Sequence, residues 1–258
     1  MKLSKTLLAV FLYNIILHYK TIKLLTPLLI RLTLLFFIML HTLNAQMPVQ
    51  QFQEKDTKVL DYLEFKNNKT IPKEIEKQAL LALSFYPELK DTKIIFRLKK
   101  RNTPLTSRPR ILSVFRGKKK RAYVITISSQ TKDHLDPILF SKLPYNAQVG
   151  VLGHEIGHII DYKKKSSFQL IGLSFKLFNA DFVDSFEFNT DQRTIEHGLG
   201  YQLLDWSIFV RKALGVIEWK GASVDLEAGN LPEAKQRYMN PQTIRSEIQK
   251  LELYNSNL

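Results

Sequence analysis

The stretch Val151-Leu-Gly-His154-Glu155-Ile-Gly-His158-Ile-Ile160 decides how the rest of this 258-residue chain is interpreted. On an α-helix, two histidines four residues apart lie on one face, about 40° apart around the axis. That spacing lets both imidazoles reach a single zinc ion. Glu155 projects to one side, where its carboxylate can polarise a metal-bound water.

Chance and a purely structural helix are the alternatives to a metal site. With 6 His and 13 Glu in the chain, random order gives His-Glu-x-x-His roughly once in a hundred such chains. Every other position from Val151 to Ile160 is uncharged, as expected for an active-site helix pressed into a core. A buried helix with two hydrogen-bonded histidines is therefore the weaker interpretation. His154 and His158 are predicted zinc ligands, and Glu155 is the predicted general base.

A tetrahedral site with an open position for water needs a third protein ligand. Asp161 follows on the same face, but it lies about 10 Å along the helix from His154 and would not reach a shared metal. Glu187 is the preferred candidate. Asp191 lies four residues later, so both carboxylates point the same way from a second helix. One can bind zinc while the other accepts the free ring N–H of a ligating histidine. Asp161, His197 and Glu196 stay open as alternatives.

These two motifs resemble the gluzincin branch of the zincin metallopeptidases, in particular the group of CAAX prenyl endopeptidases and related bacterial membrane or periplasmic peptidases. The matching stretches are Tyr123-Val-Ile-Thr-Ile-Ser128, Ala147-Gln-Val-Gly-Val-Leu-Gly-His-Glu-Ile-Gly-His158 and Glu187-Phe-Asn-Thr-Asp191. The resemblance implies one Zn²⁺ held by His154, His158 and Glu187, with Asp191 supporting a histidine. It covers roughly residues 120–200 and departs from the usual pattern at Thr190, where alanine is common.

Composition limits the kind of site and the kind of fold. Hydrophobic residues make up 45% of the chain, enough for one large domain, and cysteine is absent. Any metal must therefore be held by His, Asp or Glu, and no disulfide framework is possible. The formal charge is +14. The first 45 residues contribute five Lys/Arg and no acid, which leaves 33 basic and 24 acidic residues, a net charge of +9, in the remainder.

Residues 1–45 are expected to be a signal peptide or a membrane anchor. The sub-segment from Arg31 to Leu40 has the charged start and short apolar body of a secretory signal, and cleavage is plausible before Gln46. The alternative is an uncleaved anchor from Leu24 to Leu43, which is about long enough to span a bilayer. We expect an exported protein, periplasmic or secreted, whose remaining residues 46–258 form a single catalytic domain.

Between Arg97 and Arg121 the chain carries eleven Lys/Arg and no acid. One interpretation is a patch that contacts an anionic surface; the other is a loop kept soluble by its charge. Few aromatic residues are interleaved there, so no specific nucleic-acid partner is predicted.

The expected fold class is α+β, zincin-like and mainly helical, with a small β-sheet before the active-site helix. Strands are predicted at 92–98, 111–115 and 122–128, the last two forming a hairpin around 117–120. The active-site helix is predicted at Ala147–Tyr162 with Asn146 as its N-cap. Gly153 and Gly157 indicate close approach by another backbone.

The function expected from these features is that of an exported zinc metallopeptidase acting on proteins or peptides. Tyr123–Ser128 is the candidate edge strand for aligning a peptide substrate. The alternative is a non-catalytic protein of zincin fold that binds the cell envelope or a polyanion. An intact Glu155 argues against that alternative, because a structural metal site has no need of that carboxylate. Another amide hydrolase, such as one acting on peptidoglycan, is a third possibility.

Overall fold

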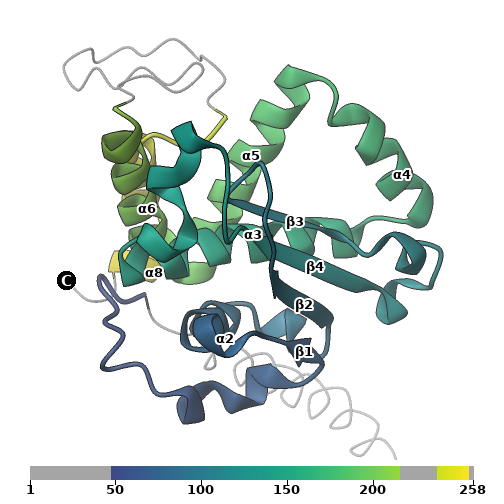
Figure 1. Ribbon diagram of the computed structural model, residues 1–258, viewed down its shortest axis with the longest axis horizontal. Helices are drawn as coiled ribbons and strands as arrows, with labels where there is room; N and C mark the ends of the chain where they lie inside the picture. The colour runs from purple at the N-terminus through teal and green to yellow at the C-terminus, as the bar shows by residue number, and fades with distance from the viewer. Residues whose placement is uncertain (1–47, 216–236, 256–258) are drawn as a thin grey trace, which may run out of the picture. The chain divides into compact units, whose positions relative to one another are not determined.

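A 20-residue helix, α3 (Tyr145–Lys164), lies at the centre of the structure and carries the His-Glu-x-x-His motif (Figure 1). The computed structural model describes residues 48–215 and 237–255, which all belong to one compact unit, Gln46–Leu258. The predicted signal or anchor, 1–45, lies outside the described residues. Within the described ranges, no helix combines the length and the apolar character needed to cross a membrane.

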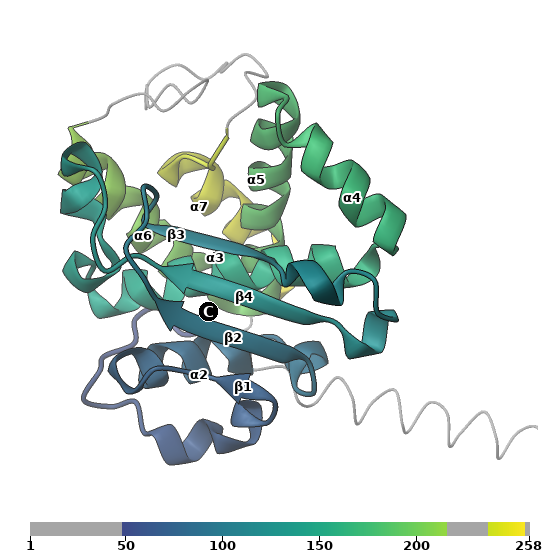
Figure 2. The ribbon, with the colours of Figure 1, turned by 45° about the vertical axis from the view of Figure 1, so that its right-hand side comes forward.

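Four strands precede α3 and form one mixed sheet in the order β1-β2-β4-β3 (Figure 2). Strands β1 (Lys69–Thr70), β2 (Lys93–Leu98) and β4 (Ala122–Ile127) are parallel. Strand β3 (Leu105–Pro109) pairs antiparallel with β4 and forms the edge. The predictions of strands at 92–98 and 122–128 are confirmed, as is an α+β class with a small sheet before the motif helix.

The predicted strand at 111–115 is wrong. The hairpin partner of β4 is β3, and Ile111–Ser113 is a short 3₁₀ helix in the connection between them. Ser113 explains the difference, because its hydroxyl donates to the Arg110 carbonyl at 2.7 Å and accepts from the Ala122 N–H at 3.1 Å. These bonds close the chain into a turn. The prediction of Tyr123–Ser128 as the edge strand is also wrong, since β4 lies between β2 and β3.

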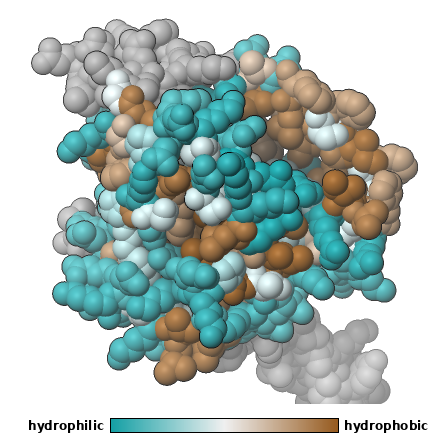
Figure 3. Space-filling view, viewed as in Figure 1, coloured by the Kyte–Doolittle hydropathy of each residue, from teal (hydrophilic) through white to brown (hydrophobic). Residues whose placement is uncertain are grey.

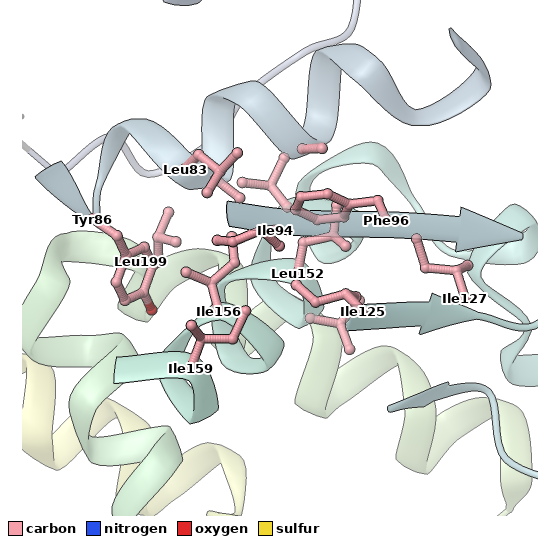
Figure 4. Close-up of a cluster of buried hydrophobic side chains, with 14 of the residues drawn as sticks. Leu83, Tyr86, Ile94, Phe96, Ile125, Ile127, Leu152, Ile156, Ile159 and Leu199 are labelled. Carbon is pink, nitrogen blue, oxygen red and sulfur yellow. The ribbon is translucent and has the colours of Figure 1, made fainter. Parts of the chain in front are cut away.

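The main core lies between the sheet and the helices α2 (Glu76–Ser84) and α3 (Figure 4). Alternate residues of the strands point inward, including Ile94 and Phe96 of β2 and Ile125 of β4, all at most 1% exposed. They meet Leu152 and Ile156 of α3. The face of α3 that holds the sheet is therefore apolar, which leaves another face for the polar side chains of the motif.

The described part of the chain after α3 is helical. Its elements are α4 (Ser167–Lys176), α5 (Ala180–Thr194), a π-helical turn (Ile195–Leu199), α6 (Gly200–Leu214), α7 (Pro241–Lys250) and α8 (Glu252–Asn255). Helices α5 and α6 pack directly against α3. The chain bends between α5 and α6 at Gly198, whose φ of 93° suits glycine. The bend lets α5 and α6 pack against α3 as separate helices.

Small residues on α3 allow these helices to approach closely. A Cβ at Gly150 would lie 2.2 Å from the backbone oxygen of Gln202 on α6, and a Cβ at Gly153 would lie 2.5 Å from the Leu199 side chain. At Gly157 a Cβ would lie 3.2 Å from the Thr190 methyl group on α5. Close packing at Gly153 and Gly157 is present, but the nearest atoms there belong to side chains, so the predicted approach of another backbone is wrong at both; it occurs at Gly150.

The predicted N-cap of α3 is wrong. The helix begins at Tyr145 after Pro144, and Asn146 lies inside its first turn. The Asn146 amide is used for tertiary contacts instead, donating to Asp205 at 2.6 Å and accepting from the Phe52 N–H at 2.9 Å. Proline at the N-cap position ends the extended segment, so the helix starts without a side-chain cap.

Candidate metal centre

Two buried histidines of α3 form the first part of the site. His154 and His158 are 2% and 5% exposed, and their ring centroids are 4.7 Å apart. Because they are one helical turn apart, the two rings face the same space beside the helix. Glu155, between them in sequence, is also buried at 7% exposure.

Helix α5 supplies the third donor. The Oε2 atom of Glu187 lies 3.0 Å from the Nε2 of His154 and 3.2 Å from the Nε2 of His158. One donor atom from each of these three side chains falls within a single group 4.8 Å across. Two nitrogens and one carboxylate oxygen are a donor set suited to zinc. The structure therefore brings together the three residues predicted as ligands.

The three alternative third ligands lie elsewhere. Asp161, about one turn beyond His158 on α3, accepts a hydrogen bond from the Lys165 ammonium group at 2.6 Å. His197 bonds Glu88 at 2.8 Å and the Arg193 carbonyl at 2.7 Å. Glu196 is exposed and lies 3.4 Å from the Gln192 amide.

Asp191 holds the far side of the His154 ring. Its Oδ1 lies 2.7 Å from the His154 Nδ1, and its Oδ2 accepts from the Met239 N–H at 2.7 Å. Asp191 is fully buried. The contact predicted between Asp191 and a candidate ligand is present, and the same carboxylate also fastens the segment before α7.

Thr190 plays the matching part for His158. Its hydroxyl donates to the Phe186 carbonyl at 2.8 Å, so it has no proton left for the His158 Nδ1 at 3.1 Å and must accept there. Both rings therefore carry their Nδ1 proton toward a protein acceptor, which leaves each Nε2, the atom that faces Glu187, as the one available to a metal once it is deprotonated. The threonine that departs from the family pattern has a definite role here.

Burial and charge shape the acid–base properties of the site. Burial opposes protonation of His154, but hydrogen bonds to Asp191 and Glu187 outweigh it and raise its pKa to about 10. Burial likewise opposes ionisation of Glu187, and the two histidines outweigh it and hold the pKa of Glu187 well below its usual range. A proton shared between these groups is what a metal ion would replace.

Glu155 differs from the other carboxylates. Burial raises its pKa, and its Oε2 atom has no hydrogen-bond partner among the described residues. A buried carboxylate oxygen without a partner is costly unless it has another role. Glu155 lines a cavity of about 550 Å³ together with His154, His158 and Glu187.

The sheet edge forms one wall of this cavity. Strand β3 and the residues before it contribute Thr103, Pro104, Leu105, Thr106 and Ser107. The Arg110 N–H donates to the Ala122 carbonyl, and the Pro104 carbonyl accepts from the Ser128 N–H. The even-numbered residues from 104 to 110 therefore turn their backbone groups toward β4. Backbone groups alternate along an antiparallel strand. Leu105 and Ser107 therefore present theirs to the free edge, where Ser107 accepts from the Tyr162 hydroxyl at 3.3 Å.

Aromatic residues complete the cavity, and sequence reasoning missed them. Trp206 of α6 and Tyr238 both line it, with ring centroids 5.9 and 5.8 Å from that of His154. Burial raises the pKa of Tyr238 well above its ordinary value, which keeps the phenol protonated. His197, one of the alternative third ligands, does not line the cavity.

Comparisons with known proteins give this site no relative: no family model, no curated protein and no solved structure matches the chain. The geometry defines a class of site, with two helical histidines and a carboxylate from a second helix. The resemblance to zincin peptidases stays a prediction carried by the motifs.

Proposed function

We propose that this chain is an exported zinc metallopeptidase with a zincin-like domain, using one Zn²⁺ held by His154, His158 and Glu187. The observation that carries the proposal is the convergence of these three donors beside the buried, unpartnered Oε2 of Glu155. The hydrogen bonds to Asp191 and Thr190 support it, because they orient both rings as metal ligands require.

Zinc, when bound, would supply a Lewis acid that activates water and polarises the scissile carbonyl. Glu155 would accept the proton of the attacking water and deliver it to the nitrogen of the leaving amine. Its raised pKa suits both steps, since the carboxylate must take up and release a proton within one turnover. Tyr238 lines the same cavity, and its phenol would donate a hydrogen bond to the charge that develops on the carbonyl oxygen.

The peptide substrate would bind along the free edge of β3. The backbone groups of Leu105 and Ser107 can pair with an extended peptide, which extends the sheet by one strand over the cavity. Backbone pairing fixes the direction of the peptide without selecting side chains. The cavity walls, which are largely apolar, would then select them.

The test compares Glu155→Gln with the unaltered protein and with Glu74→Gln, an exposed acid outside the site. We expect all three proteins to bind one zinc per chain, measured by metal analysis. Cleavage of a peptide library, read by mass spectrometry, should fall by a factor of about 100 or more for Glu155→Gln and stay unchanged for Glu74→Gln. A chelator should abolish cleavage by the unaltered protein. Undiminished cleavage by Glu155→Gln would refute the role of this residue, and failure of the unaltered protein to bind zinc would refute the proposal.

A further inference from the structure

Helix α4 is apolar on two opposite faces. Leu170 and Leu173 are buried against the rest of the protein. Phe168, Ile171 and Phe175 lie within about 60° of one another on the other face, and they are 86%, 40% and 69% exposed. A surface helix normally needs only one apolar face. The second face has no covering element among the described residues.

A second exposed apolar segment lies beside the start of α4. In the connection between β3 and β4, Ile111, Leu112 and Phe115 are 67%, 76% and 73% exposed. The Ser167 hydroxyl donates to the Val114 carbonyl at 2.7 Å, which fixes this connection to the first turn of α4. Brown, hydrophobic atoms gather over α4 at the right of Figure 3. We call these six residues and Phe178, which is 89% exposed, the α4 surface.

Basic residues flank the α4 surface on the side of the connection. The connection contains Arg110 before its apolar residues and Arg116, Lys119 and Lys120 after Phe115. Lys118 donates to the Lys164 carbonyl at 2.6 Å, so the basic turn lies next to the end of α3, where α4 begins. The chain contains no acid from Arg97 to Arg121, a range that includes the whole connection. The exposed apolar side chains therefore have only basic residues beside them on the side of the connection.

We propose that the α4 surface docks the protein on a lipid bilayer that contains anionic phospholipids. Exposed aromatic and aliphatic side chains on a convex helix can enter the boundary between headgroups and acyl chains, and nearby Lys/Arg attract the anionic headgroups. A protein partner would usually offer charges of both signs, whereas every charged residue of the connection beside α4, from Arg110 to Arg121, is basic. Phe168, Ile171 and Phe175 project from a helix, and the hollow that Ile111 and Leu112 line is shared with three arginines, Arg97, Arg108 and Arg110.

Docking would place the candidate site close to the bilayer. Leu177, which follows α4 directly, lines the cavity that contains His154 and Glu155. Substrates at the membrane surface would therefore be favoured. This consequence rests on the proposed function, but the docking itself does not.

The absence of cysteine allows a direct test on the full chain. A single Phe175→Cys variant carries an environment-sensitive fluorophore, and Leu60→Cys, at a site that is 76% exposed near α2, is the matched control. With vesicles of equal parts phosphatidylcholine and phosphatidylglycerol, we expect a blue shift and quencher protection at position 175 and none at position 60. Phosphatidylcholine vesicles alone should give a much weaker response. The readout is local, so it does not depend on where the N-terminal segment goes.

Unlabelled variants give an independent measurement by vesicle flotation. Phe168→Ser/Phe175→Ser and Lys119→Glu/Lys120→Glu should each lower binding to anionic vesicles about tenfold relative to Leu60→Ser and Lys58→Glu/Lys73→Glu. Equal responses at positions 175 and 60 would overturn the proposal. A label at position 175 that is already shielded before vesicles are added would also overturn it. Shielding that increases with protein concentration would show that a second copy covers the surface. Shielding that does not depend on protein concentration would show that a segment of the same chain covers it. Zinc content and peptide cleavage are measured separately, so either proposal can fail while the other stands.

Discussion

At the scale of single residues, the site depends on two side chains, Asp191 and Thr190, that each hold one histidine ring and one backbone group. Asp191 joins His154 to the Met239 backbone, and Thr190 joins His158 to the Phe186 carbonyl. Each Nδ1 proton has one acceptor, so the orientation of each ring is fixed by the protein without a metal. The ligands are therefore organised when the protein folds, and little rearrangement is needed for metal binding.

Asp191→Asn should weaken zinc binding about 10- to 100-fold. An amide has a single acceptor oxygen, so it can serve either His154 or Met239 but not both. The measurement is competition with a chromophoric chelator. Asp133→Asn, an exposed acid before the cavity, is the control and should leave the affinity unchanged. Equal zinc affinities for Asp191→Asn and the unaltered protein would mean that this carboxylate does not orient the ligand.

At the scale of secondary-structure elements, the site depends on how closely the helices pack. Glu187 reaches the histidines because α5 lies against α3. Helix α6 also packs against α3, with its backbone close to Gly150. The Gly198 bend separates α5 from α6 so that both can contact α3. Backbone-to-backbone contact at a glycine is therefore part of the support for the metal centre.

Gly150→Ala should destabilise the protein by about 3 kcal/mol, because the new methyl group would lie 2.2 Å from the backbone oxygen of Gln202 and the helices must move apart. Gly172→Ala on α4 is the control, since no atom lies within 4 Å of its added Cβ. Higher helix propensity should make that variant about 1 kcal/mol more stable. Urea unfolding measures both changes. Equal free energies of unfolding for the two variants would show that α3 and α6 are not in close contact.

At the scale of the whole molecule, local and long-range features differ in how far the sequence predicts them. The motif helix, the second helix with Glu187 and Asp191, and the bend at Gly198 follow from spacings within one helix or from one glycine. The edge position of β3 does not, because it depends on which strand pairs with β4. Thr190 lies between two predicted residues and its position on α5 could have suggested it. Trp206 and Tyr238 reach the cavity only through tertiary packing, which no spacing in the chain records.

Zinc would connect two parts of the fold, since α3 supplies two donors and α5 the third. A ligand that binds only the native state stabilises it, by about 2.7 kcal/mol when free zinc is 100 times the dissociation constant. We therefore expect zinc to raise the unfolding temperature and a chelator to lower it, measured by differential scanning calorimetry. The gain in unfolding temperature should increase from pH 6 to pH 8, because zinc must displace the proton that His154 holds with its pKa of about 10.

Glu187→Gln should lose most of this stabilisation by zinc, while Glu196→Gln and Asp161→Asn should keep it, because those carboxylates lie outside the donor group. Full stabilisation of Glu187→Gln by zinc would exclude Glu187 as the third ligand and require another residue to join α3 to the metal.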